Sequence, residues 1–533
     1  MRLILSSRAF FALVGWGLLG AGGAAAQPPM LPVAPEKVPA KMTAVDPPPG
    51  TILQPGEYPI ELGTALQLAG VQNPELLLAR QRVVEATAIR QLAAAQLLPN
   101  INAGTNYDTH NGPLQQANGN ILNVNRNALF VGLGANAIAA GSVNIPGIYY
   151  NLNVGTTWFS ILQARQLVAR NAALSEAVKI DLLMRVCLAY SELLRSEGRR
   201  AVALRNRGEV AEVARLTAAY AKAGQGRKAD ADRAAVELKR RDVEFTQAEA
   251  EMLTSSARLC QLLSLDPTTR LKPLDGWIVP APVVPDAVPL PELLAIALLQ
   301  RPELAARRAE IQEALLGLTN AKLLPFSPNV IMGFSSGSFG GGSNLLANGI
   351  RQADGTTLTG SQFGQFGGRT DFDVVAYWTL QNLGVGNVAL IRGAQSRLKQ
   401  TELRQLETLN RIRTEVAEAD ARVRARYSQI DSTEKAVRTS LESYQEDLAR
   451  IKGRQGLPIE VIDSLRLLSS SRNAYLDAII DYNRAQFQLY GALGRPPAGA
   501  LARPVPADLV PPPGKPSAEL PAPKLKDPKP ANP

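Results

Sequence analysis

Histidine, cysteine and aromatic residues are scarce in this chain of 533 residues, and each shortage excludes a class of function. One histidine (His110) and two cysteines (Cys187 and Cys260) are too few for a histidine-rich metal site, a zinc ribbon or a disulfide-stapled fold. Aromatic residues make up 5%, which is thin for a sugar-binding surface or a platform that stacks nucleobases. We interpret His110 as exposed in an Asn/Gly-rich loop and both cysteines as small buried residues of helices. We expect no enzyme activity, no cofactor and no metal site.

Motifs that suggest other chemistry lack the context they need. Residues 333–337 have the Gly-x-Ser-x-Gly spacing of a nucleophile elbow, but that motif needs a strand-to-helix turn and a later histidine. His110 comes earlier, and residues 333–337 read as a Gly/Ser loop. Basic runs at 239–241 and 422–426 have acidic neighbours, which favours solvated helix faces over a nucleic-acid surface.

Long apolar runs are also scarce: after residue 26, no apolar run is long enough to form a transmembrane helix. Residues 1–26 have the features of a secretory signal peptide: Arg2 and Arg8, an apolar stretch over 10–20, and small residues before Gln27. We expect this Sec-type signal peptide to be removed on export. A membrane role then requires β-strands, the other backbone that satisfies its hydrogen bonds in lipid.

The 38 prolines divide the chain, because proline costs about 3 kcal/mol inside a helix. They concentrate in an N-terminal segment (27–60), a linker (266–289) and a tail that we expect to be disordered (496–533). The proline-free stretches 160–265 and 382–457 have helical periodicity. In the second, apolar residues recur every seven positions, as in a coiled coil: Leu409, Val416, Val423, Ile430, Val437, Tyr444 and Ile451.

The same succession of elements occurs twice, which predicts two structural repeats over 61–265 and 290–495. Pro74 and Pro302, Pro99 and Pro325, and Gly224 and Gly453 mark equivalent places at a spacing of roughly 228 residues. Each repeat is expected to contain, in order, an opening helix, strands, a helix about 100 Å long, a glycine turn and a return helix. The expected ranges are 61–98, 100–159, 160–223, 224–228 and 227–265 in the first repeat, and 290–324, 326–380, 387–451, 453–458 and 458–494 in the second.

The two strand regions alternate between apolar and polar residues. Even-numbered residues from Ile148 to Trp158 are mostly apolar, and the second region alternates similarly up to Trp378. About ten residues of such alternation are typical of a transmembrane barrel strand, although a soluble sheet alternates equally well. In a barrel, Val374 and Ala376 are expected to face lipid, whereas Asp373 and Val375 face the interior. Four strands per chain are too few to close a barrel, which predicts an oligomer.

These features together resemble the outer membrane efflux protein (TolC) family over roughly residues 60–495. The resemblance depends on the doubled order of helix, Leu-Leu-Pro, strands with a terminal Trp, long helix and glycine tip, and on the ending Ala492-Leu493-Gly494. It implies a mostly α fold with a membrane β-barrel: a homotrimer with one twelve-stranded barrel and an α-helical periplasmic tunnel.

The resemblance also implies a location, partners and a role. The protein is expected in the cell outer membrane, with a long periplasmic portion in contact with a periplasmic adaptor protein and an inner-membrane transporter of the RND or ABC type. Its expected role is that of a passive exit duct for efflux or type I secretion, and the cargo remains open. A structural coiled-coil protein of the envelope without channel activity is the alternative.

The resemblance assigns site residues by position. Glu460 and Asp463 match the acidic constriction at the family's tunnel entrance, although the tip before them departs in spacing from the commonest pattern. Simple helix capping is the alternative role for these acids and for Asp230. The helix tips, where an adaptor would dock, contain Gly224, Gly226, Asp230, Gly453 and Gly456, and the aromatics at the membrane interface are Trp158 and Trp378.

Overall fold

The computed structural model of the chain describes residues 56–115, 117–135, 144–275, 278–285, 288–343, 364–453 and 455–495. The predicted signal peptide, most of the N-terminal proline-rich segment and the C-terminal tail lie outside these ranges. Within them, no helix has both the length and the apolarity needed to cross a bilayer.

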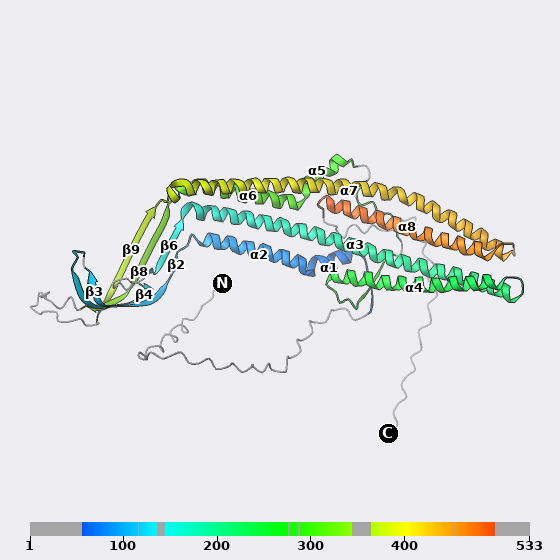
Figure 1. The fold of residues 1–533 in the computed structure, drawn as a ribbon, viewed down its shortest axis with the longest axis horizontal. Coiled ribbons are helices and arrows are strands. Elements are labelled where there is room, and N and C mark those ends of the chain that lie inside the picture. Colours follow the sequence, from blue (N-terminus) through cyan, green and yellow to red (C-terminus); the bar gives the residue numbers. More distant parts are fainter. Residues whose placement is uncertain are drawn as a thin grey trace, which may run out of the picture. The chain divides into compact units, whose positions relative to one another are not determined.

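Two very long helices organise the described chain (Figure 1). Helices α3 (Val154–Lys222) and α7 (Val385–Lys452) contain 69 and 68 residues, so each is about 100 Å long. Each turns back into a return helix that packs along it, α4 (Lys228–Leu263) after α3 and α8 (Pro458–Ala492) after α7. The long helices predicted from the missing prolines are confirmed, and Val416, Val423, Ile430, Tyr444 and Ile451 of the seven-residue pattern are buried.

The opening helices differ from the prediction, because each is two helices rather than one. The first region contains α1 (Leu62–Gln72) and α2 (Pro74–Ala95), and the second contains α5 (Leu290–Gln300) and α6 (Pro302–Leu323). The breaks fall at Asn73 and Arg301, where ψ is 125° and 120°. A proline ring disfavours the helical conformation of the residue before it, but it is well suited to the first position of the next helix.

The middle of the helical body contains two apolar clusters where the shorter helices meet. Ala65 and Leu66 of α1 pack with Leu259 of α4 and Leu193 of α3, and a matching cluster joins α5, α7 and α8. Beside the first cluster, β1 (Glu57–Ile60) pairs in parallel with β7 (Arg270–Pro273). Cys187 and Cys260 are buried in the first cluster, as predicted, and burial raises the pKa of Cys187 to about 12.

At the far end of the long helices from their turns, one antiparallel sheet forms (Figure 1). Its strands are β2 (Asn100–Ile101), β3 (Ala103–Gln115), β4 (Ile121–Ala135), β5 (Ile145–Pro146), β6 (Ile148–Asn153), β8 (Asn329–Ser343) and β9 (Gly364–Tyr377). Strands β4 and β6 follow one another along one edge of β8, and β9 pairs with the other edge. With β3 paired to β4 and β2 to β6, the sheet has four lines of strand, the number predicted.

Three details of the strand regions were predicted wrongly. Trp158 lies in α3, because strand β6 ends at Asn153, whose side chain accepts a hydrogen bond from the Thr156 amide at 2.9 Å and starts the helix. His110 lies in β3 rather than in a loop, and it is only partly exposed. Residues 333–337 lie inside β8, so they form no strand-to-helix turn.

The pairing register separates the two faces of the described strands of this sheet by charge. Residues directly opposite each other share a face, so Asp108, Ala128 and Gly341 lie on one face, as do Gly337 and Arg369. All six charged or histidine residues of the described strands of this sheet fall on that face: Asp108, His110, Arg126, Arg369, Asp371 and Asp373. The opposite face has apolar rows that include Ile148, Phe334 and Phe372, and Met332 and Val374.

Candidate functional site

The turn between α3 and α4 is closed by backbone hydrogen bonds at its glycines. The amides of Gln225 and Gly226 both donate to the Tyr220 carbonyl, at 2.9 and 3.0 Å. Gly224 has a φ of +75°, which favours glycine, and a Cβ at Gly226 would lie 3.2 Å from the Tyr220 Cβ. The sequence therefore ends α3 where a left-handed residue permits a tight reversal.

The turn between α7 and α8 closes by the same geometry. The amides of Gln455 and Gly456 donate to the Arg450 carbonyl at 2.9 and 3.2 Å, and Pro458 begins the return helix. Gly453, in contrast to Gly224, has a φ of −78°, so its conformation does not require glycine. The two helical hairpins thus end in similar tips.

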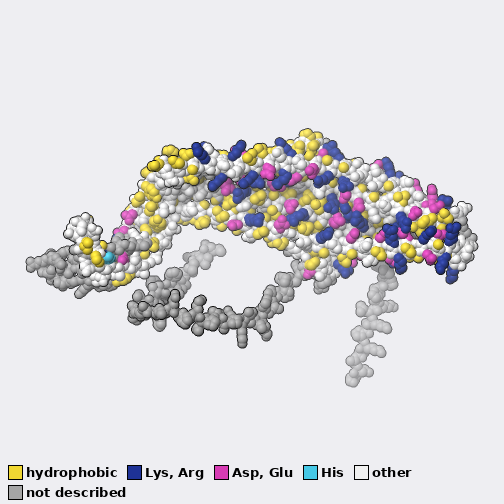
Figure 2. All heavy atoms as spheres, in the orientation of Figure 1, with side chains coloured by type: hydrophobic (Ala, Val, Ile, Leu, Met, Phe, Trp, Pro, Cys, Tyr) yellow, Lys and Arg dark blue, Asp and Glu magenta, His cyan; other side chains and the backbone are white. Residues whose placement is uncertain are grey.

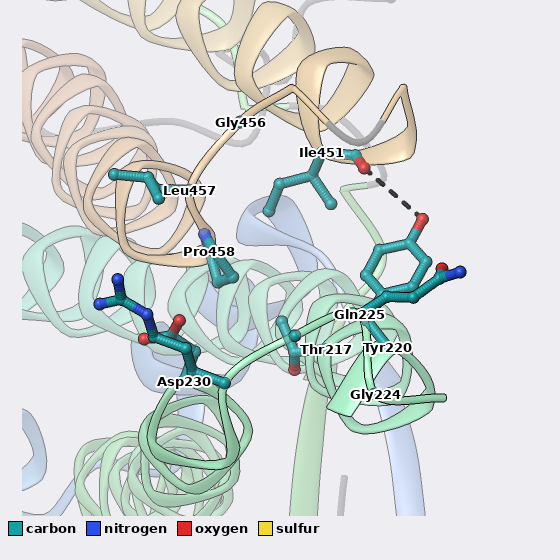
Figure 3. A pocket seen from close by; sticks show the side chains of 11 residues that line it. Thr217, Tyr220, Gly224, Gln225, Asp230, Ile451, Gly456, Leu457 and Pro458 are labelled. Carbon is teal, nitrogen blue, oxygen red and sulfur yellow. Dashed lines mark hydrogen bonds between the residues drawn. The ribbon is translucent and has the colours of Figure 1, made fainter. Parts of the chain in front are cut away.

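A cavity of about 600 Å³ lies between the two tips (Figure 3). Four of the five tip residues named from the sequence line it: Gly224, Gly226, Asp230 and Gly456. The Tyr220 hydroxyl donates to the Ile451 carbonyl across the gap at 3.5 Å, a long hydrogen bond that connects the first tip to the second.

The acidic residues of the second tip are both engaged within their own helix. A Glu460 carboxylate oxygen accepts the Leu457 amide hydrogen at 3.2 Å, which is a helix-capping contact. The Asp463 side chain is 62% exposed and accepts a hydrogen bond from Arg466 at 3.2 Å. At the first tip, Asp230 pairs with Arg233 at 3.4 Å. Capping therefore accounts for one contact of Glu460, and the exposed Asp463 remains accessible from solvent.

Behind the second tip, a buried charge cluster joins the two hairpins. The Glu237 carboxylate of α4 accepts hydrogen bonds from Arg241 of the same helix and from Arg466 of α8, each at 2.8 Å. The side chains of Glu237 and Arg241 are only 4% and 7% exposed. Burial opposes ionisation of Glu237, but the bond from Arg466 and the charge of Arg241 outweigh it and hold its pKa below the usual value.

The sequence-based interpretation of residues 239–241 as a solvated face is wrong for Arg241. Lys239 and Arg240 are exposed, whereas Arg241, the next residue along the helix, projects from the buried side of α4. The spacing of Glu237 and Arg241, four residues apart, was the available signal. Further ion pairs between the hairpins include Arg472 with Glu209 at 2.7 Å and Lys452 with Glu212 at 3.0 Å.

The two tryptophans lie at the junction of strands and helices, Trp158 inside α3 and Trp378 just after β9. Trp378 directly follows β9, is exposed, and donates its indole hydrogen to the Phe326 carbonyl at 3.2 Å. Trp158 is exposed on α3. On the face in Figure 2, charged side chains gather over the helices and become sparse toward this end.

The long paired helices and the sheet with its charges on one face define a class of fold found in solved outer-membrane channels. The outer-membrane channel OprN superposes with a TM-score of 0.63 at 20% identity, over 81% of this chain and 89% of that one. VceC from Vibrio cholerae gives 0.60 at 16% identity, over 81% and 96%. The open-state channel MtrE from Neisseria gonorrhoeae gives 0.59 at 20%, over 81% and 89%.

The family itself is indicated by the sequence comparison. Residues 65–264 match the model of the family described as outer membrane efflux protein. The resemblance to that family drawn from the sequence is thereby confirmed. A comparison with curated protein sequences gives no match.

Proposed function

We propose that this protein is the outer-membrane exit duct of an efflux or type I secretion system, formed by three copies of the chain. The four strand lines of each copy would contribute to one twelve-stranded barrel, and the long helices would form a tunnel through the periplasm. The duct would conduct passively and have no chemistry of its own.

The observation that carries the proposal is the register of the sheet. All six charged or histidine residues of its described strands occupy one face, while apolar side chains such as Phe334, Phe372 and Val374 occupy the other. A sheet with lipid on one face and a water-filled interior on the other needs this separation, because charges on a lipid face are costly. Phe372 and Val374 are also more than half exposed on the single chain.

The edges of the sheet support a trimer. Among the described residues, β3 pairs only with β4 and β9 only with β8, so each presents an open edge. Open edges are not tolerated in lipid, and four strands are too few to close on themselves. The flanking helices α2 and α7 also expose apolar side chains, among them Leu78 and Leu92 on α2 and Leu403 and Leu406 on α7.

The helix tips would form the periplasmic mouth. Three copies of Glu460 and Asp463 would surround one axis there, and the tips with Gly224, Gly226, Asp230, Gly453 and Gly456 would contact a periplasmic adaptor protein. That adaptor would connect the duct to an inner-membrane transporter of the RND or ABC type. The strands would lie in the outer membrane after removal of the signal peptide.

Two measurements on one preparation test the proposal. Detergent-extracted protein is expected to be a trimer of about 160–170 kDa, from a chain of 57.0 kDa less its signal peptide. The same trimer in planar bilayers is expected to open discrete channels. A stable folded monomer would contradict the architecture, and a trimer that never conducts would favour a structural envelope spacer.

A further inference from the structure

Strand β9 presents three charges at alternate positions on the polar face of the sheet. Arg369, Asp371 and Asp373 lie opposite Gly337, Ser335 and Gly333 of β8. Alternate residues of a strand share a face, and successive members of this series are about 7 Å apart. In the duct proposed above, on which this inference rests, all three face the interior.

Arg369 is held by two partners. Its Nε lies 2.9 Å from a carboxylate oxygen of Asp371, and its guanidinium lies 4.8 Å from the centre of the Phe339 ring. Both side chains of the ion pair are largely shielded, at 26% and 30% exposed. A charge-assisted contact and a cation–π contact together fix the arginine beside the acid, so the two opposite charges offset each other.

The residues of β8, β4 and β3 in line with Arg369 across the sheet are glycines. Arg369 lies opposite Gly337 of β8, and Gly337 lies beside Gly132 of β4. Gly132 in turn lies opposite Gly104 of β3. A Cβ at Gly337 would lie 2.5 Å from the Val131 carbonyl oxygen and 2.7 Å from the Phe130 ring. A Cβ at Gly132 would likewise lie 2.5 Å from the Gly337 Cα, so side chains are excluded at both positions, and the Arg369 side chain extends toward Phe339.

Asp373 differs from Asp371 in having no such partner. Its side chain is exposed, and within the part of the chain that the structure describes it forms no ion pair. The residue opposite it, Gly333, contributes no side chain. Strand β9 thus contributes one offset pair and one uncompensated negative charge.

We propose that Asp373 sets the cation preference of the strand-lined part of the duct, and that the Arg369–Asp371 pair keeps a fixed arginine from opposing it. Three copies would place three carboxylates around one water-filled interior with low-dielectric walls. Rings of carboxylates in such pores attract cations and repel anions.

Reversal potentials under a KCl gradient test this assignment. Asp373→Asn is expected to lower the cation-to-anion permeability ratio about fourfold, because three unit charges roughly 10 Å away in salt-screened water change the concentration of each ion about twofold and in opposite directions. Arg369→Gln is expected to raise the ratio because it removes a positive charge from the interior, and Asp371→Asn is expected to lower it because it removes a negative charge. The double variant Arg369→Gln/Asp371→Asn is expected to return to the wild-type ratio.

Controls separate this inference from the function on which it rests. Val375→Thr changes the same face of β9 without changing charge, and it is expected to leave the ratio unaltered. Repeating the series in a Glu460→Ala/Asp463→Ala background removes the contribution of the tips, and Asp373→Ser provides a second neutral variant if Asn impairs assembly.

Absence of channels in the wild-type trimer would overturn the proposed function. Wild-type channels with an unchanged ratio in Asp373→Asn, or a double variant that behaves like either single one, would overturn the inference alone.

Discussion

At the scale of single residues, the buried carboxylate of Glu237 on α4 links this helix to α8 by an ion pair with Arg466. It accepts hydrogen bonds from Arg241 and Arg466 while its side chain is only 4% exposed. Such an ion pair contributes little compared with apolar packing, but removal of Glu237 is costly because the charge of Arg241 stays buried. Glu237 is therefore the residue where a small chemical change has a large expected effect.

Glu237→Gln is expected to lower the free energy of unfolding by roughly 3 kcal/mol, the lower end for a broken buried ion pair, because Arg241 keeps its contact with Glu244. Urea denaturation followed by circular dichroism measures this loss. Glu418→Gln is the matched control, since it removes an exposed pair with Arg422, and it is expected to change stability by less than about 0.5 kcal/mol. Equal effects of the two substitutions would contradict the role of burial.

The same carboxylate predicts how stability depends on pH. The folded state holds the pKa of Glu237 below its usual value of 4.5, so its contribution is present above that pH and is lost as pH falls through the lower, folded pKa. The stability difference between wild type and Glu237→Gln is expected to be constant near neutral pH and to shrink in acid. Unfolding curves at several pH values from neutral to strongly acid measure it, and a difference that grows on acidification would contradict the assignment.

At the scale of elements, the two faces of β9 are expected to respond differently to one substitution. Val374 and Val375 are adjacent and similarly exposed on the single chain, but they lie on the apolar and the polar face, respectively. Val374→Arg is expected to cost roughly 2–4 kcal/mol near the bilayer midplane and to impair insertion. Val375→Arg is expected to be tolerated, because its side chain faces the interior. The yield of trimer folded in liposomes measures both variants, and equal tolerance would indicate a soluble sheet.

Elements also show where local sequence rules were sufficient. The missing prolines and the seven-residue pattern predicted α3 and α7, because long uninterrupted helices need only a continuous apolar stripe and no breaker. The breaks at Asn73 and Arg301 follow from an equally local rule, the restriction before proline, which the single-helix prediction overlooked. The start of α3 was missed because residues 154–158 continue the alternation of β6, and the cap at Asn153 prevails over it.

At the scale of the whole molecule, the acidic residues of the second tip matter only if copies meet around an axis. Glu460→Ala/Asp463→Ala is then expected to reduce cation preference and to relieve block by polyvalent cations, because six carboxylates leave one constriction. Reversal potentials and block by divalent cations measure this, with trimer assembly as the control. If the double variant keeps the wild-type reversal potential, the two acids only stabilise the start of α8, as the Glu460 cap allows.

The sequence by itself determined the long helices, the glycine tips, the alternating strands and the family resemblance. Each of these depends on neighbours within one or two helical turns or on a repeated local pattern. Only the tertiary structure decided which charges are buried, which residues lie opposite each other across the sheet, and that a cavity lies between the tips. Glu237 and Arg466 are more than 200 residues apart in sequence, and Arg369 and Phe339 meet through the pairing of β8 with β9. Such contacts depend on how elements pack, because burial and register are properties of the assembled chain rather than of any local segment.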